Sequence, residues 1–178
     1  FVTKADTIGV GEAGTSPIFT VVGSKPVDIT EKTGIPTVEK KIVSDKDSRE
    51  YDAADSQIGQ NVTYNLYGTI AENFDKYDTY FYRFSDQISK GLTLQTGAKV
   101  YLYKNRTDAK GDLARAKGTD ITAYFNEETP AEAAEDGSKT TTWTCDNLKK
   151  VDGVTKDSYI VVSYTAQINE SAVVGLDN

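Results

Sequence analysis

The stretch "DSYIVVSYTAQI", residues 157–168, decides the fold class of this protein. From residue 160 onward, one parity is apolar or aromatic throughout: Ile160, Val162, Tyr164, Ala166 and Ile168. Because successive side chains of a β-strand point to opposite faces, these five side chains share one face. The alternation is rich in β-branched and aromatic residues, and it predicts a strand with that face in a core.

Four further stretches alternate with the same period of two. They are residues 61–70, 78–88, 98–105 and 140–148. Helical signals are weak. We expect one short turn or helix around Ala123–Phe125, and Pro130 interrupts any longer helix there. Many short strands joined by polar loops predict an all-β sandwich.

A domain boundary is predicted near the start of the chain. Residues 24–38, "SKPVDITEKTGIPTV", are polar and contain two prolines and a glycine, which is typical of a linker. We therefore divide the chain into residues 1–32, the tail of a preceding domain plus a linker, and residues 33–178, the main domain. Residues 17–23, "PIFTVVG", are a short strand candidate within the tail. The abrupt ends of the chain lead us to expect that it belongs to a longer one.

Composition argues against several classes of function. The 178 residues carry a formal net charge of −7, whereas a nucleic-acid partner needs a basic face. The chain has no histidine, which is the commonest general base and metal ligand. Its one cysteine, Cys145, permits neither an intrachain disulfide nor a thiol cluster for zinc. No run of 18 apolar residues is present, so we expect no membrane span, and we expect no metal and no cofactor.

The segment "PTVEKKIV", residues 36–43, raises a question about its two lysines. In a strand, Lys40 shares a face with Val38 and Ile42, whereas Lys41 lies on the opposite face. Whichever face is buried, one lysine is buried with it. One interpretation is an edge strand on which Lys40 only discourages pairing with other chains. The other is an amine that burial keeps neutral and therefore nucleophilic.

Asp86 presents a similar choice. It falls on the same parity as Tyr80, Tyr82 and Phe84, and a carboxyl group on a buried aromatic face resists ionisation. The alternative is that Asp86 caps the turn into residues 87–92, "QISKGL", and lies in water. A buried lysine beside a protonated carboxyl group would be poised to attack an amide, which requires a nearby asparagine or glutamine.

Three pieces of the sequence, taken in order, resemble a known family. Residues 36–42, "PTVEKKI", resemble its opening strand, with a lysine two residues before an aliphatic residue. Residues 52–94 contain "IG", "YDTY" and "FSDQISKGL" in the order of its core. Residues 157–178, "DSYIVVSYTAQINESAVVGLDN", resemble its closing part. From about residue 36 to its end, the chain resembles the isopeptide-forming D2 domain of the sortase-assembled backbone pilins of Gram-positive bacteria.

The resemblance implies a fold and a chemistry. The fold is an Ig-like β-sandwich of the pilin D2 or collagen-adhesin A type, and the chemistry is a spontaneous isopeptide bond between a lysine and an asparagine on the first and last strands. By its place in the motifs, Lys40 corresponds to the reactive lysine, and Lys41 is expected to face solvent. Asp86 corresponds to the acid that promotes the reaction, and Asn178 to the reactive asparagine. The alternatives to Asn178 are Asn169 and an asparagine beyond the end of the chain.

The resemblance also implies a mechanism and a location. Aromatic burial would keep Lys40 neutral and Asp86 protonated, so that Asp86 hydrogen-bonds to the asparagine amide and stabilises the tetrahedral species before ammonia leaves. This is a single-turnover event, and the domain is not expected to be an enzyme. The expected role is structural, in a pilus at the cell wall, outside the cell, where sortase joins the subunit covalently to other subunits.

A ligand-binding domain of a cell-wall-anchored adhesin is the alternative. The loops of residues 104–140 would then carry the site for a host ligand, and an exposed aromatic platform in them would favour this alternative. A hydrolase ranks below both, because the sequence offers no histidine and no convincing nucleophile or metal cluster.

Overall fold

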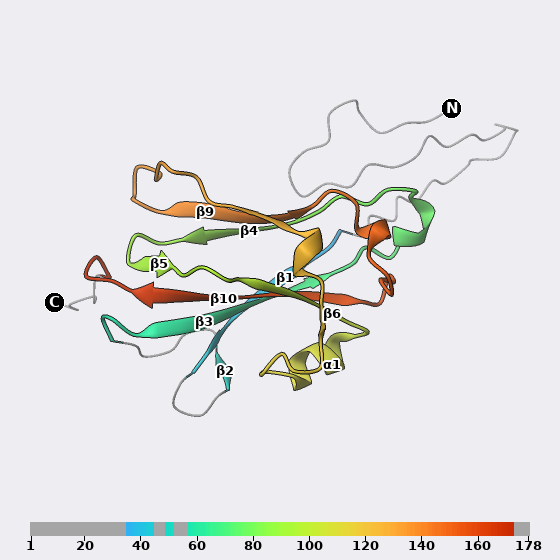
Figure 1. The fold of residues 1–178 in the computed structure, drawn as a ribbon, viewed down its shortest axis with the longest axis horizontal. Helices are drawn as coiled ribbons and strands as arrows, with labels where there is room; N and C mark the ends of the chain where they lie inside the picture. Colours follow the sequence, from blue (N-terminus) through green and yellow to red (C-terminus); the bar gives the residue numbers. More distant parts are fainter. Residues whose placement is uncertain (1–34, 45–48, 52–56, 173–178) are drawn as a thin grey trace, which may run out of the picture.

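The computed structural model describes residues 35–44, 49–51 and 57–172 of the chain (Figure 1). The strands in these residues are β1 (Val38–Val43), β2 (Glu50–Tyr51), β3 (Asn61–Thr69), β4 (Tyr82–Ile88), β5 (Leu92–Leu94), β6 (Lys99–Tyr103), β7 (Thr119–Asp120), β8 (Asn126–Glu128), β9 (Lys139–Cys145) and β10 (Tyr159–Ile168). The helical segments are α1 (Arg106–Gly111) and 3₁₀ turns at Phe74–Lys76, Thr122–Tyr124 and Leu148–Lys150. The prediction of an all-β chain with a short turn near Ala123 is confirmed.

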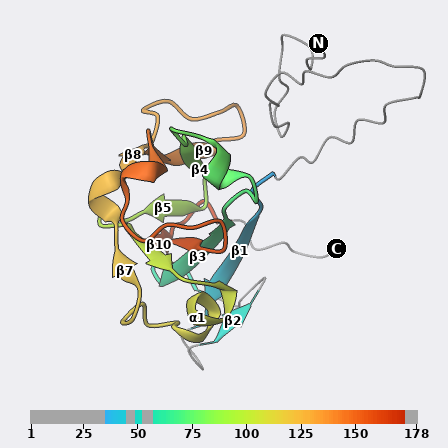
Figure 2. The same ribbon diagram turned by 90° about the vertical axis from the view of Figure 1, so that its right-hand side faces the viewer.

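Two antiparallel sheets pack as a sandwich (Figures 1 and 2). The larger sheet has the strand order β2-β1-β3-β10-β6-β7, and β5 also pairs with β10. The smaller sheet has the order β4-β9-β8. Because β1 and β4 belong to different sheets, a side chain from each can meet only across the core.

The main core lies between the two sheets. It includes Val62, Tyr64 and Leu66 of β3, Tyr82, Phe84 and Ile88 of β4, Val100 and Leu102 of β6, Trp143 and Cys145 of β9, and Ile160, Val162, Tyr164 and Ala166 of β10. Ile168 is partly buried against the same cluster. These are the alternating positions that the sequence assigns to one face of each strand, so the predicted periodicity is confirmed.

The opposite face of the larger sheet carries a second apolar cluster. It consists of Tyr67, Tyr103, Ala109 and Val161. Figure 2 places α1 on this side of the larger sheet, away from β4 and β9. The sequence analysis did not predict α1, because its six residues are too few to show a helical period. Its start is fixed by Asn105, whose side chain accepts a hydrogen bond from the backbone N–H of Asp108 (2.9 Å).

Gly68 of β3 lets the smaller sheet approach closely. A Cβ atom at this position would lie 2.3 Å from Oη of Tyr82 and 2.6 Å from Cζ of Phe84, so any side chain would push β4 away. The Tyr82 hydroxyl also donates a hydrogen bond to the carbonyl of Thr69 (2.9 Å). These contacts hold the first half of β4 against β3 and thereby set the depth at which Asp86, farther along β4, lies.

Several predictions concern residues that the structure does not describe. Residues 1–34, with the predicted tail and the strand candidate at residues 17–23, lie outside the described ranges, as does Asn178. In the described part of the chain, no helix is long and apolar enough to cross a membrane.

Candidate functional site

Lys40 and Asp86 meet between the two sheets. Lys40 Nζ donates hydrogen bonds to both carboxylate oxygens of Asp86, at 3.0 Å from Oδ1 and 2.8 Å from Oδ2. The lysine comes from β1 of the larger sheet and the aspartate from β4 of the smaller one. The side chain of Asp86 is 12% exposed and that of Lys40 is 36% exposed. The site is therefore a largely buried carboxylate with an amine at the rim of the core.

Asp86 lies within a strand and not in a turn. It stands opposite Thr141 of β9 in the antiparallel ladder, and its neighbours of the same parity, Phe84 and Ile88, are in the main core. This placement differs from the alternative in which Asp86 caps the turn at residues 87–92 and lies in water. The alternation of side chains therefore predicts correctly that Asp86 points to the same face of β4 as Phe84.

Tyr164 is the third member of the site. Its hydroxyl donates a hydrogen bond to Oδ2 of Asp86 (2.5 Å). Sequence reasoning placed Tyr164 in the core but did not connect it with Asp86. The parity of each strand was readable, but the pairing of positions across two sheets depends on how the sheets pack, and no local pattern encodes that.

Aromatic rings surround the amine and the carboxylate. Lys40 Nζ lies 4.8 Å from the ring centroid of Tyr64 and 5.8 Å from that of Tyr164, within the range of cation–π attraction. The Tyr164 ring stacks on Tyr64 (5.2 Å between centroids) and on Trp143 (5.3 Å). Burial raises the pKa of both Tyr64 and Tyr164, and the interaction of each with Asp86 raises it further. Their hydroxyl groups therefore stay protonated at physiological pH and are available as donors.

Lys40 combines features of both interpretations of its strand. Its part of β1 pairs with β3, where Lys40 stands opposite Leu66. Within the described residues β2 pairs only with Ile42 and Val43, so the other edge of β1 is uncovered at Lys40. The lysine is on an edge, as the first interpretation has it, yet its amine is directed to the inter-sheet carboxylate.

The expectation that Lys41 faces solvent is not met. Its side chain is 21% exposed, less than that of Lys40, and its amine lies 3.2 Å from a carboxylate oxygen of Glu39. Lys110 of α1 lies 3.2 Å from the other oxygen of Glu39. Glu39 thus joins Lys41 to Lys110 of α1, a helix that was not predicted.

The structure does not bring Asn169 to Lys40. Its carboxamide nitrogen donates to the carbonyl of Lys90 (2.9 Å) and to Oγ1 of Thr93 (3.0 Å), and its oxygen accepts from the backbone N–H of Ser171 (2.9 Å).

The strand register explains the separation between Asn169 and Lys40. Lys40 stands opposite Leu66, which stands opposite Val162. Asn169 is seven positions beyond Val162, or roughly 23 Å along an extended strand. A lysine side chain does not span that distance.

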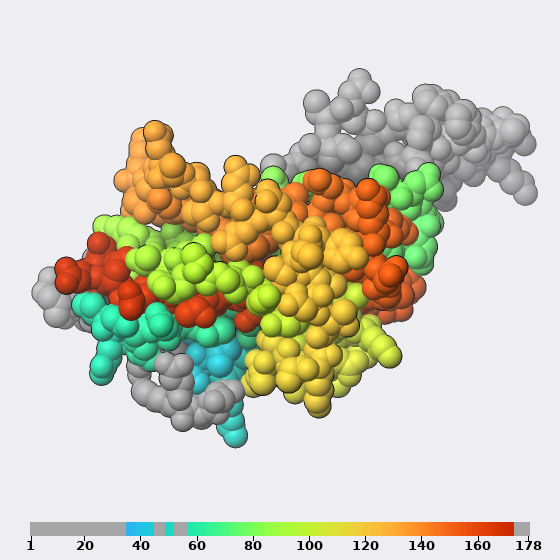
Figure 3. All heavy atoms as spheres, in the orientation of Figure 1, coloured from blue at the N-terminus to red at the C-terminus, as the bar shows by residue number. Residues whose placement is uncertain are grey.

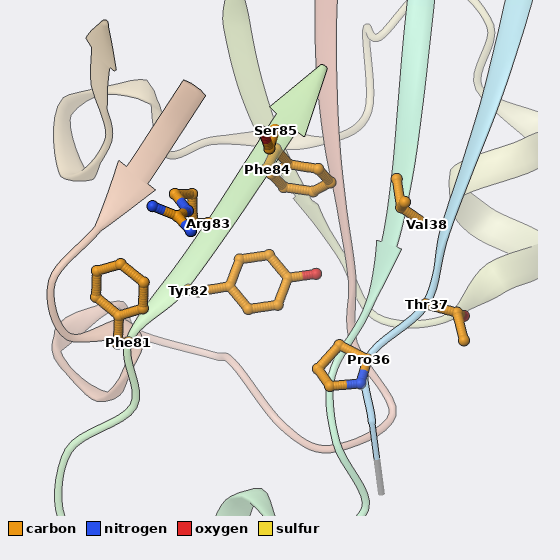
Figure 4. Close-up of a pocket in the computed structure, with 8 residues that line it drawn as sticks. All are labelled: Pro36, Thr37, Val38, Phe81, Tyr82, Arg83, Phe84 and Ser85. Atoms are coloured by element: carbon orange, nitrogen blue, oxygen red, sulfur yellow. The ribbon is translucent and has the colours of Figure 1, made fainter. Parts of the chain in front are cut away.

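An open groove runs beside the Lys40–Asp86 pair. Among the described strands β4 pairs only with β9, so its other edge faces the start of β1. The residues that line the groove are Pro36, Thr37, Val38, Phe81, Tyr82, Arg83, Phe84 and Ser85 (Figure 4). In Figure 4, Tyr82 and Phe84 point from β4 toward the strands of the larger sheet, and Arg83 points away. The groove ends at Val38 and Ser85, close in sequence to Lys40 and Asp86, which do not line it.

The described residues do not offer a metal site. No group of three or more Cys, Asp or Glu side chains in this part of the chain is arranged to hold an ion.

Comparison with known proteins identifies the fold. No family model matches the chain, and no curated protein matches it. Among solved structures, the C-terminal domain of the antigen I/II-family protein AspA from Streptococcus pyogenes has a TM-score of 0.51 and 22% identity, over 75% of this chain and 38% of that chain. The C-terminal domain of the antigen I/II polypeptide BspA from Streptococcus agalactiae has a TM-score of 0.50 and 18% identity, over 76% and 42%. The chain has the fold of these two C-terminal domains.

A pilin is also among the similar structures. The major pilin SpaA of Corynebacterium diphtheriae has a TM-score of 0.48 and 15% identity, over 75% of this chain and 27% of that chain. The chain thus spans less than half the length of each of these three proteins. The expected all-β sandwich is confirmed as a fold.

Proposed function

We propose that this chain contributes a structural domain to a pilus or related fibre on the surface of a Gram-positive bacterium, and that Lys40 forms an isopeptide bond with an asparagine. The observation that carries the proposal is the Lys40–Asp86 pair, an amine and a carboxyl group from different sheets at 2.8 Å. In a longer protein the domain, residues 33–178, follows another domain that ends near residue 32. Sortase links the subunit to others in the fibre.

The geometry supplies what amide formation needs. Transfer of one proton from the Lys40 ammonium to the Asp86 carboxylate gives a neutral amine beside a neutral acid, with the heavy atoms already in place. The amine then attacks the asparagine carbonyl carbon while the Asp86 O–H group hydrogen-bonds to the carbonyl oxygen. The new C–N bond forms, the bond to the carboxamide nitrogen breaks, and ammonia leaves with a proton from the amine. Nothing is oxidised or reduced, and no cofactor takes part.

Asn178 is the proposed partner, and the position of Ala172 supports this assignment. A Cβ atom on Gly91 would lie 2.7 Å from Cα of Ala172, so Ala172 lies against the turn five positions after Asp86. Six residues of extended chain span roughly 20 Å, and the uncovered edge of β4 leads from this turn back to Asp86. A segment of that length would be long enough to bring the carboxamide of Asn178 to Asp86 and Lys40. An asparagine that follows residue 178 in a longer chain is the alternative.

A crosslink at this position explains how the domain would bear load. It ties β1, the first described strand, to the segment that follows β10. Pulling on the two ends of the domain would then stretch a covalent path and would not peel the strands apart. Cys145, the one cysteine, cannot supply such a tie.

A ligand-binding domain of an adhesin is the second candidate, favoured by the likeness to the antigen I/II domains. Host ligands would then be bound by the loops of residues 104–140. Of the large hydrophobic side chains exposed in the described structure, Tyr124, 47% exposed, is the one in these loops. One exposed ring does not make an aromatic platform, and we therefore rank the structural role first.

Intact-mass spectrometry tests the proposal. The wild-type chain is expected to weigh less than its sequence mass by one ammonia. Lys40→Ala and Asp86→Asn should each have their full sequence masses, whereas Lys41→Ala, the matched control, should still lack one ammonia. A full sequence mass for the wild type, both in this chain and in a longer one that includes the following residues, would rule the bond out.

A further inference from the structure

The two carboxylate oxygens of Asp86 differ in the number of hydrogen bonds that they accept, because Tyr164 donates to one of them. Among the described residues, Oδ2 receives hydrogen bonds from both Tyr164 and Lys40, whereas Oδ1 receives one, from Lys40. A carboxylate oxygen has two lone pairs in its plane. Oδ2 is therefore filled, and Oδ1 keeps a free acceptor position.

The ring of Tyr164 is held so that its hydroxyl group cannot turn away. The residue is 2% exposed and lies between the rings of Tyr64 and Trp143, which are nearly parallel to it at 13° and 23°. Trp143 is fixed in turn, because its indole N–H donates to a carboxylate oxygen of Glu127 (2.9 Å). Burial raises the pKa of Tyr164, and the hydrogen bond to Asp86 raises it further. The phenol therefore remains a donor throughout the physiological pH range.

From these contacts we infer that Tyr164 is a positioning residue for the crosslinking reaction, acting through Asp86. This inference rests on the proposed function. By occupying Oδ2, Tyr164 directs the proton that leaves the Lys40 ammonium to Oδ1. The resulting O–H group on Oδ1 then donates to the carbonyl oxygen of the incoming asparagine. The phenol proton does not move during the reaction, and the atoms balance as in the scheme above.

Tyr103→Phe is the matched control for Tyr164→Phe. Both residues are buried tyrosines, and both substitutions remove only a hydroxyl oxygen. Tyr164 donates to Asp86, whereas Tyr103 donates to Asp112 (3.0 Å) and belongs to the second apolar cluster on the other face of the larger sheet. A loss of crosslinking rate that Tyr164→Phe shows and Tyr103→Phe does not show belongs to the hydrogen bond to Asp86 and not to the removal of a buried hydroxyl group in general.

The test follows bond formation in the chain during cell-free synthesis. Samples are quenched in denaturant at intervals, and the loss of ammonia is read by intact mass at several pH values. We expect Tyr164→Phe to react at least tenfold more slowly than wild type at neutral pH, and Tyr103→Phe to react within about twofold of wild type. The pH profile of the rate, including its high-pH limit, should also differ between Tyr164→Phe and wild type, because the variant lacks the donor to Oδ2 of Asp86. A merely structural role would not move that limit.

Two measurements separate the possible failures. Thermal unfolding of Lys40→Ala and of Lys40→Ala/Tyr164→Phe, neither of which can crosslink, reports the effect of the substitution on folding alone. If wild type and Tyr164→Phe lose ammonia at the same rate and with the same pH dependence, the positioning role is wrong and the crosslink stands. If wild type loses no ammonia at all, the crosslink itself is wrong and the role of Tyr164 falls with it.

Discussion

The amine of Lys40 lies 2.8 Å from Oδ2 of Asp86, although the two residues belong to different sheets and are 46 positions apart in the sequence. Packing of the sandwich alone brings them together, because no element connects β1 directly to β4. The pair is joined by Tyr164 on a third strand. Lys40, Asp86 and Tyr164 thus form a polar contact between the two sheets, surrounded by aromatic side chains. Substitutions at these residues should therefore change the stability of the domain.

Lys40→Ala should destabilise the domain strongly. The proposed bond from Lys40 to Asn178 closes a loop of most of the main domain, and the chain-entropy formula assigns about 5 kcal/mol of unfolding free energy to a crosslink of that size. Guanidinium unfolding of the wild type and the variant measures the difference. Since Lys40→Ala also leaves Asp86 without its cation, Lys40→Ala/Asp86→Ala is the control, and it should remain several kcal/mol below wild type. Equal midpoints for wild type and the double variant would show that no crosslink stabilises the fold.

Gly68→Ala should destabilise the sandwich by about 1–3 kcal/mol, the usual cost of overpacking. The added methyl group would meet Tyr82 and Phe84 at less than 3 Å, so β4 would have to move away from β3. Gly111→Ala is the matched control, because a Cβ atom there meets nothing within 4 Å, and alanine is favoured over glycine in helices by roughly 0.5–1 kcal/mol. Chemical denaturation of both variants tests the contrast, and equal effects would contradict the close approach at Gly68.

The alternation of side chains was sufficient to predict which residues of β3, β4 and β10 face the core. It also placed Asp86 on a buried aromatic face and Lys40 on the face shared with Ile42. Contact between Lys40 and Asp86 did not follow from those patterns, because strand parity carries no information about which strands of two sheets lie opposite each other. That expectation came from the resemblance to a family.

Two features could not be predicted for physical reasons. The helix α1 is too short for a periodic signal, and its start at Asn105 depends on one side-chain hydrogen bond to Asp108. The environment of Lys41 was also wrong, because its ion pair with Glu39, which Lys110 of α1 shares, was not visible in the sequence. The contact between Tyr164 and Asp86 can be recognised only once the packing of the two sheets is known.

Because of Asp112, the stability of the domain should decrease at acid pH. Burial raises the pKa of Asp112, but hydrogen bonds from the backbone N–H groups of Lys117, Ala116 and Gly118 and from the Tyr103 hydroxyl outweigh it, so that the net pKa is lowered. A lowered pKa in the folded state gives stability that is present above the unfolded pKa, about 3.9, and is lost as the pH falls through the folded value.

Asp112→Asn measures that contribution. At pH 7 the variant should be less stable than wild type by about 1–3 kcal/mol, because buried N–H groups lose a charged acceptor. The gap should narrow as the pH falls below about 4. Urea unfolding at a series of pH values gives both quantities, with the exposed Asp152→Asn as a control that shows neither effect. A gap that is constant from pH 7 to pH 2 would contradict the assignment.

Peptide mapping by tandem mass spectrometry tests the proposed bond most directly. Proteolysis of the wild type should release a branched peptide in which the side chain of Lys40 is joined to that of Asn178, one ammonia lighter than the sum of its two arms. The same digest of Asp86→Asn should give only linear peptides. Recovery of Lys40 solely in linear peptides from the wild type, and also from a longer chain that includes the residues after 178, would contradict the crosslink.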